Sequence, residues 1–301
     1  MHFDRTRIEI RERTLAEIID LALLIVRQSG GRILLAMLPL TLVMAAFNHF
    51  LIGWMASWEY YHYESDFIPV RYVVNMSLLI FLEVPFVSVV PTLYLGQYVF
   101  HDHPSLRRAW RELPGLLVPV LINLVVWRGP AIAVLLLWNA ESDANYSAGE
   151  FFLLMWCGLQ FLLRTSRPYL PEIVLLERHP LRGKKANQVT VGKRNQLFHR
   201  FGHSNTFSRS IGAALIAVLL ACAMAHGALF MNGVFLGNWR WSSTLVNVAF
   251  PAAVWLAAAF VIVIRFLNYL DVRIRDEGWE IDLRLRSEAN RLIQRMTGST
   301  P

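Results

Sequence analysis

The feature that most constrains this chain is a series of apolar segments, each long enough to cross the hydrocarbon core of a membrane. A transmembrane helix needs about 20 predominantly apolar residues. Six segments approach or exceed this length: residues 31–55, 73–100, 113–138, 151–163, 210–236 and 243–268. The fourth has a short apolar core and runs into Pro168 and Pro171, which break or kink helices. We predict an all-α membrane protein with six transmembrane helices.

Composition agrees with this class. Hydrophobic residues make up 55% of the 301 residues and charged residues only 17%, whereas a soluble domain has about 25% charged residues. We therefore expect one polytopic membrane domain over residues 1–301, with an amphipathic N-terminal segment (1–30), a basic loop (178–209) and a charged C-terminal segment (269–301). Cys157 and Cys222 both lie in apolar runs, which favours small buried side chains over a disulfide or a metal site.

The distribution of Lys and Arg predicts the orientation. Residues 1–32, 101–112, 164–209 and 265–301 hold 26 of the 29 basic residues, and they alternate with the predicted spans. Only Arg71 and Arg240 fall on the opposite side, which is rich in Trp and Tyr. Because basic residues accumulate in cytoplasmic loops and aromatic residues at membrane interfaces, we expect both termini in the cytoplasm.

Short amphipathic helices are expected to precede alternate spans at the cytoplasmic surface. Thr14 and Glu17 have the spacing of an N-terminal capping box. They introduce an apolar stripe at helical spacing, followed by a turn at Gly30-Gly31; the stripe is Leu15, Ile18, Ile19, Ala22 and Val26. "HPSLRRAWRELPG" before the third span repeats this scheme, and "HSNTFSRSIG" before the fifth is a weaker copy. The spacing favours three repeated units of elbow helix plus helical hairpin.

The strip "YLDVRIRDEGWEIDLRLR", residues 269–286, admits two structures. Strict alternation of charged and apolar residues is typical of a strand, and Glu277-Gly278 could form the turn of a hairpin. The same residues also pair at helical i,i+4 spacing, as Asp271 does with Arg275. Helix is favoured, because the strip continues an apolar helix and an isolated hairpin is marginal in water.

This strip, within "RFLNYLDVRIRDEGWEIDLRLRSEA", resembles the C-terminal signature of uncharacterised six-span prokaryotic membrane proteins. They are similar to the membrane domain attached to some bacterial glycerophosphodiester phosphodiesterases. "EIVLLERHPLRGKKANQVTVGKRNQ", residues 172–196, resembles the inner loop of the same group in a planctomycete-like form. The resemblance implies a bacterial inner-membrane protein of unknown activity. It does not imply phosphodiesterase chemistry, which belongs to a separate soluble barrel.

A charged side chain inside a transmembrane span has a high free-energy cost, and such residues often have a functional role. Glu83 and Arg128 are each about 10 residues below the outer end of their predicted spans, about 15 Å deep, and His226 is at a similar level. An ion pair between Glu83 and Arg128 that holds two helices together is the favoured interpretation. The alternatives are a path for protons or a polar solute in which His226 takes part, or a side chain that reaches the lipid headgroups.

The cytoplasmic loop carries a basic cluster that could contact anionic lipid headgroups: Arg182, Lys184, Lys185, Lys193, Arg194 and Arg200. A charge run that only sets topology explains it equally well. No phosphate-binding loop, metal-ligand set, cofactor motif or catalytic set is visible, and no nucleic-acid partner is expected. We therefore expect a non-enzymatic scaffold or partner subunit of a cell-envelope process. The alternative is a transporter or lipid-handling protein with a polar centre at Glu83 and Arg128.

The orientation can be tested with single cysteines. A cysteine at Ser65 or Ser147 should react with a membrane-impermeant thiol reagent in intact cells. A cysteine at Ser204 or Ser299 should react only after permeabilisation. Labelling at Ser299 in intact cells would overturn the six-span arrangement.

Overall fold

The computed structural model describes residues 11, 13–62, 68–100, 103–126, 129–138, 147–178 and 190–277. All regular secondary structure in these ranges is helical. The α-helices are α1 (Leu15–His62), α2 (Val70–Val87), α3 (Val89–Phe100), α4 (Leu106–Val120), α5 (Pro130–Trp138), α6 (Ala148–Ser166), α7 (Leu170–Glu172), α8 (Val191–Leu236) and α9 (Phe250–Glu277). Three π-helical segments accompany them: η2 (Leu121–Val126), η3 (Ile173–Glu177) and η4 (Leu245–Ala249).

Four helical segments are long and apolar enough to cross a membrane: Leu15–Ser57, Val70–Val87, Phe207–Leu236 and Leu245–Arg275. They correspond to the first, second, fifth and sixth predicted spans, so the all-helical membrane class is confirmed. The third and fourth spans stay predictions. The third is divided among α4, η2 and α5, and the 19-residue α6 carries Glu150, Gln160 and Arg164.

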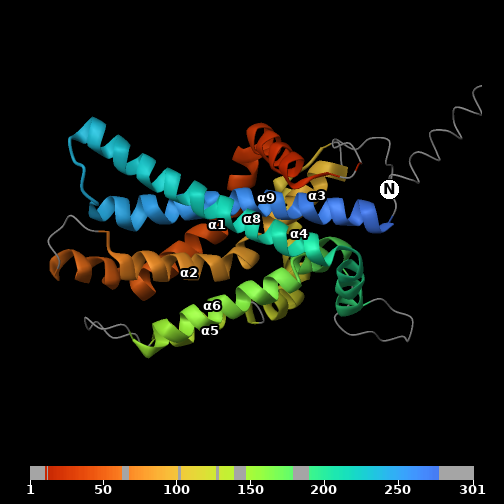
Figure 1. The fold of residues 1–301 in the computed structure, drawn as a ribbon, viewed down its shortest axis with the longest axis horizontal. Coiled ribbons are helices and arrows are strands. Elements are labelled where there is room, and N and C mark those ends of the chain that lie inside the picture. The colour runs from red at the N-terminus through yellow and green to blue at the C-terminus, as the bar shows by residue number, and fades with distance from the viewer. Residues whose placement is uncertain are drawn as a thin grey trace, which may run out of the picture.

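Helix α1 begins as the capping box predicts. Thr14 N–H donates to Glu17 Oε2 (2.8 Å), and Glu17 N–H donates to Thr14 Oγ1 (3.4 Å). The buried stripe contains Ile18, Ala22 and Ile25, whereas Val26 is exposed. The predicted turn at Gly30-Gly31 does not interrupt α1, which remains helical through both glycines, but the start of α1 is out of line with the rest of the helix (Figure 1). At about 1.5 Å per residue its 48 residues measure about 72 Å along the helix path, more than the 30 Å or so of a hydrocarbon core.

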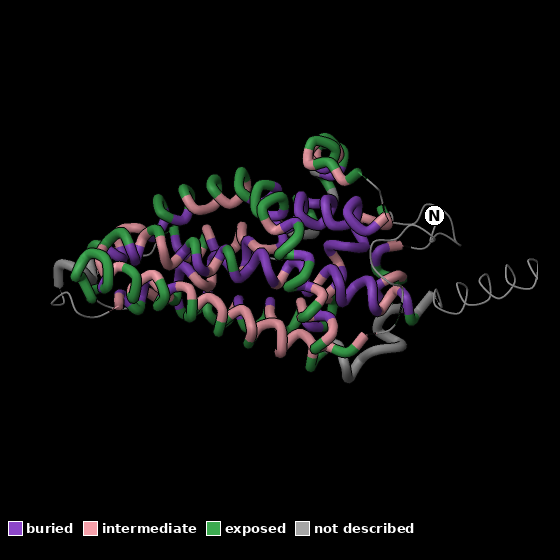
Figure 2. The backbone as a smooth tube through the Cα atoms, turned by 90° about the horizontal axis from the view of Figure 1, so that it is seen from above, coloured by how far each residue is buried: buried purple, intermediate pink, exposed green. Residues whose placement is uncertain are grey.

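The helices of each predicted hairpin pack against each other: α1 on α2, α5 on α6, and α8 on α9 (Figure 1). Figure 1 also shows the red start of α1 out of line with the rest of that helix. Helix α9 lies centrally and contacts α1, α2 and α3 as well. The interior of the bundle is buried while its outer helices are largely exposed, as Figure 2 shows. Only 6% of the apolar window of α8 is buried, against 56% for α2 and α9, as expected for a helix that faces lipid.

The second predicted span is broken at Ser88, between α2 and α3. Helix α3 is buried along its whole length up to Val99, which explains why it is apolar on all sides. Pro85 lies three residues before the break and has no N–H to offer the carbonyl of Phe81. The guanidinium of Arg164, from α6, donates to that carbonyl and, at 3.2 Å, to the carbonyl of Leu82. The helix is thus irregular beside Pro85, and a cation from another helix compensates for the missing donor.

The first half of the C-terminal strip is helical, because α9 continues to Glu277. The hairpin alternative is therefore wrong for residues 269–277. Asp271 and Arg275 form the i,i+4 ion pair that the helical alternative required, at 3.2 Å. The remainder, 278–286, lies outside the described residues.

Because Arg164 donates to the carbonyl that Pro85 leaves without a backbone donor, we predict that the effects of substituting these two residues on the free energy of unfolding are not additive. Arg164→Met should lower the free energy of unfolding by about 1.5–3 kcal/mol, the usual contribution of a hydrogen bond to a charged group. In a Pro85→Ala background the new N–H can satisfy Phe81, so the same substitution should cost less. A double-mutant cycle measured by SDS unfolding in mixed micelles checks this. Equal costs in both backgrounds would show that the carbonyl of Phe81 does not depend on Arg164.

Candidate functional site

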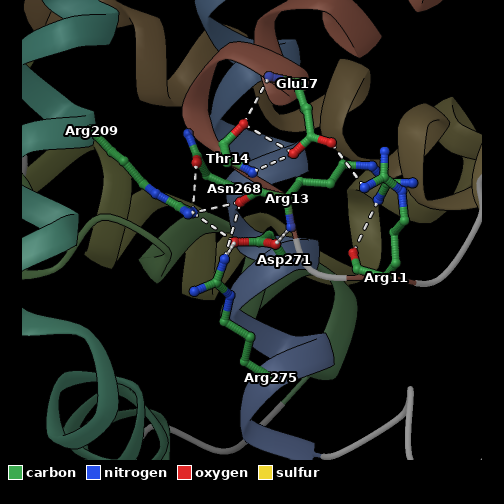
Figure 3. Close-up of polar contacts among 8 residues, drawn as sticks. All are labelled: Arg11, Arg13, Thr14, Glu17, Arg209, Asn268, Asp271 and Arg275. Atoms are coloured by element: carbon green, nitrogen blue, oxygen red, sulfur yellow. Dashed lines mark hydrogen bonds and ion pairs between the residues drawn. The ribbon is translucent and has the colours of Figure 1, made fainter.

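Among the described residues, three groups of polar contacts lie at one end of the bundle, called here the basic end and defined by Arg13, Arg209, Arg265, Arg273 and Arg275. Figure 3 shows its first part, centred on Asp271, which is 2% exposed. The Asp271 carboxylate accepts from Arg209 Nη1 (2.7 Å) and from the main-chain N–H of Arg13 (2.8 Å), and it pairs with Arg275. Both arginines also donate to the carbonyl of Arg13, at 3.0–3.1 Å. This Asp271 cluster ties the start of α1 and the middle of α8 to the end of α9.

A second ion pair at the basic end joins Glu172 of α7 to Arg265 of α9. Arg265 Nε donates to Glu172 Oε1 at 2.7 Å, and its Nη2 donates to Ser88 Oγ at 3.0 Å. Ser88 Oγ in turn donates to the carbonyl of Pro85 at 2.8 Å. Glu172 is completely buried, so this pair fixes α7 and α9 to the break between α2 and α3.

Glu177, at the end of η3, forms the third group. Its carboxylate accepts from Arg194 Nε and from Tyr269 Oη, each at 2.8 Å, and it lies 3.9 Å from Arg273 Nε. These contacts join the start of α8 to α9. The rings of Tyr169 and Tyr269 lie 6.1 Å apart beside them. In each of the three groups the carboxylate has an arginine partner, and the contacts join helices that are far apart in sequence.

The described residues of the basic cluster predicted to contact lipid have different environments in the structure. Arg194 already pairs with Glu177, whereas Lys193 is exposed and its N–H bonds to Thr190 Oγ1 at the start of α8. Arg182, Lys184 and Lys185 lie outside the described residues, as does the side chain of Arg200. Within the ranges that the structure describes, no group of three or more His, Cys, Asp or Glu side chains could hold a metal ion.

A separate polar contact lies in the middle of α2. Glu83, 3% exposed, accepts a hydrogen bond from Asn48 Nδ2 of α1 at 2.9 Å. Asn48 is fully buried. Sequence spacing alone does not indicate Asn48 as a partner of Glu83, because the two residues lie on different helices. Helices α1 and α2 are antiparallel, and their register brings Asn48 to Glu83. About two helical turns away, the same register brings Met55 to Asn75.

The described contacts of Glu83 include neither of its predicted partners, Arg128 and His226. Arg128 lies outside the described residues, so the Glu83–Arg128 pair stays a prediction. His226 is exposed on α8; its Nδ1 lies 2.9 Å from the carbonyl of Cys222, and its ring packs edge-on against Trp241. The contacts described for Glu83 and for His226 share no residue.

The opposite end of the bundle carries one buried ion pair. Arg71 Nη2 of α2 lies 2.7 Å from Glu150 Oε1 of α6, and both side chains are at most 4% exposed. The guanidinium also lies 5.1 Å from the ring centroid of Trp54. The sequence predicts Arg71 only to lie on the non-cytoplasmic side and indicates no partner for it. The pairing of Arg71 with Glu150 depends on the contact of α2 with α6, which local spacing does not reveal.

Comparison of the chain with protein-family models, with curated proteins and with solved structures yields no match.

Substitution at the centre of the basic end should loosen its first helix. Asp271→Asn removes the charge that holds Arg209 and Arg275 while keeping the side-chain volume, and the loss of one partner from a buried ion pair typically costs about 3–5 kcal/mol. We expect faster tryptic cleavage after Arg13 in the detergent-solubilised protein.

The matched control is Arg108→Gln, which breaks an exposed i,i+4 pair with Glu112. Such surface pairs contribute about 1 kcal/mol or less, so this variant should be cleaved like the wild type. Unchanged cleavage in Asp271→Asn would show that the Asp271 cluster does not hold the start of α1.

Proposed function

We propose that this chain is a non-enzymatic scaffold of a bacterial inner membrane, with six spans and cytoplasmic termini, which docks a protein of a cell-envelope process on its basic end. The observation that carries the proposal is the set of ion pairs at the basic end, in which each buried carboxylate meets a partly buried arginine. It holds the start of α1, the segment before α8 and the end of α9 in one arrangement. A fixed arrangement of helix ends is what a docking platform needs, because ordering a surface on binding costs affinity.

Charge and sequence support the same orientation. The described chain stops at Arg178 and Glu277 and resumes at Thr190; the contacts of Glu177, Arg194 and Arg275 place these points at the basic end. The intervening residues 179–189 include Arg182, Lys184 and Lys185. The excess of Lys and Arg argues that this end is cytoplasmic, where basic segments also meet anionic lipid headgroups.

The two segments that resemble uncharacterised six-span bacterial proteins, residues 172–196 and the C-terminal strip, both reach the basic end as well. This agrees with a shared role for that end. The proposal makes no use of phosphodiesterase chemistry.

Purification of the full-length chain into nanodiscs from its native membrane tests the proposal. A soluble protein should co-purify in a fixed ratio with the wild type, and several-fold less with Arg182→Gln/Lys184→Gln/Lys185→Gln. The control Arg240→Gln removes an exposed cation from the opposite end and should retain the partner. A wild type that carries no protein but a tightly held lipid or polar solute would contradict the scaffold and favour a transporter or lipid-handling protein.

A further inference from the structure

Between the two ends of the bundle, α2 carries the buried carboxyl group of Glu83, whose hydrogen-bond donor differs from those of Glu150 and Glu172. Glu150 and Glu172 each accept from an arginine at 2.7–2.9 Å. Glu83 is equally buried, but its hydrogen-bond donor is the neutral amide of Asn48. Glu83 follows Arg71 by twelve residues, which corresponds to about 18 Å along α2. It is therefore well inside the membrane.

The cations of the helices packed on α2 are engaged elsewhere. Arg164 of α6 donates to the carbonyls of Phe81 and Leu82. Arg265 of α9 donates to Glu172 and Ser88. Among the residues that the structure describes, no cationic side chain pairs with Glu83.

The other elements around Glu83 offer little charge. On α1, Arg32 precedes Asn48 by sixteen residues, about 24 Å along the helix, and His49 is exposed. The described residues of η2 and α5 include no ionisable side chain, and α3 contributes only Tyr94 and Tyr98. Arg128, between η2 and α5, is the cation that the experiment below must address.

We propose that Glu83 and Asn48 form a reversible proton-binding site inside the membrane. An ionised carboxylate that is removed from water and has no cation is costly, and uptake of a proton removes that cost. The step is a simple equilibrium, in which the carboxylate and a proton from water give the neutral carboxylic acid.

Asn48 suits both protonation states. Its Nδ2–H donates to the carboxylate, and after rotation of the amide its Oδ1 can accept from the carboxylic O–H. In the described part of the chain Oδ1 is buried without a hydrogen-bond partner, so the acceptor that the neutral acid requires is present. The site is independent of the docking function proposed above, because it can be examined on the purified chain alone.

Infrared difference spectroscopy of the full-length protein in nanodiscs tests this site, because the C=O stretch of a protonated carboxyl group is resolved from that of a carboxylate. Wild type minus Glu83→Gln should contain a protonated-carboxyl band at neutral pH. The band should fade as the pH is raised, and it should shift in Asn48→Leu, in which the amide hydrogen bond is lost. Glu150→Gln and Glu172→Gln are matched controls and should leave the band unchanged, because their carboxylates are paired with arginines.

Absence of this band from wild-type protein at neutral pH would overturn the proposal, whether or not Glu83→Gln folds. A band that appears only in Arg128→Met would also overturn it, since Arg128 would then hold Glu83 ionised. A band that is unaffected by Asn48→Leu would remove Asn48 from the site.

Discussion

The contact of Arg265 with Glu172 and Ser88 is the interaction on which the arrangement of the basic end depends. It joins three parts of the chain that are far apart in sequence: α9, α7 and the break between α2 and α3. A completely buried carboxylate and a partly buried guanidinium tolerate little displacement, because the carboxylate alone would be left without compensation. The break at Ser88 therefore has a defined position, and α3 enters the interior from that position.

Charge is distributed along the bundle in a simple pattern. At both ends buried carboxylates are neutralised by arginines, as in the Arg71–Glu150 and Arg209–Asp271 pairs. At mid-depth the one described buried carboxyl group, Glu83, meets a neutral amide instead. The outer faces of α6 and α8 are apolar and exposed, in keeping with contact to lipid. The ends thus fix the register of the helices, whereas the middle retains a group whose charge can change.

Sequence spacing correctly predicted features that depend on contacts between residues close together in the chain. The Thr14–Glu17 capping box and the Asp271–Arg275 pair join residues three and four positions apart, and both are present. The helical class and four of the membrane-crossing segments followed from hydropathy alone. At Gly30-Gly31 the chain stays helical, because glycine costs a helix only about 1 kcal/mol per residue, which packing can offset.

Contacts between distant residues could not be predicted in this way. Asn48 and Glu83 are 35 positions apart, and Arg265 and Glu172 are 93 apart. Such partners are fixed by the register of packed helices, which one sequence does not specify. The depth of Glu83 identified it as unusual, but its hydrogen-bond donor depended on how α1 packs against α2.

Helix α3 is buried from Val89 to Val99, and the contact of Arg265 with Glu172 and Ser88 fixes the point at which it begins. Hydrogen–deuterium exchange of the protein in nanodiscs measures how firmly α3 is held in this position. Peptides covering Val89–Phe100 should exchange as slowly as those of α2, and Glu172→Gln should accelerate exchange in α3 while leaving α2 slow. Rapid exchange of α3 in the wild type would contradict the account.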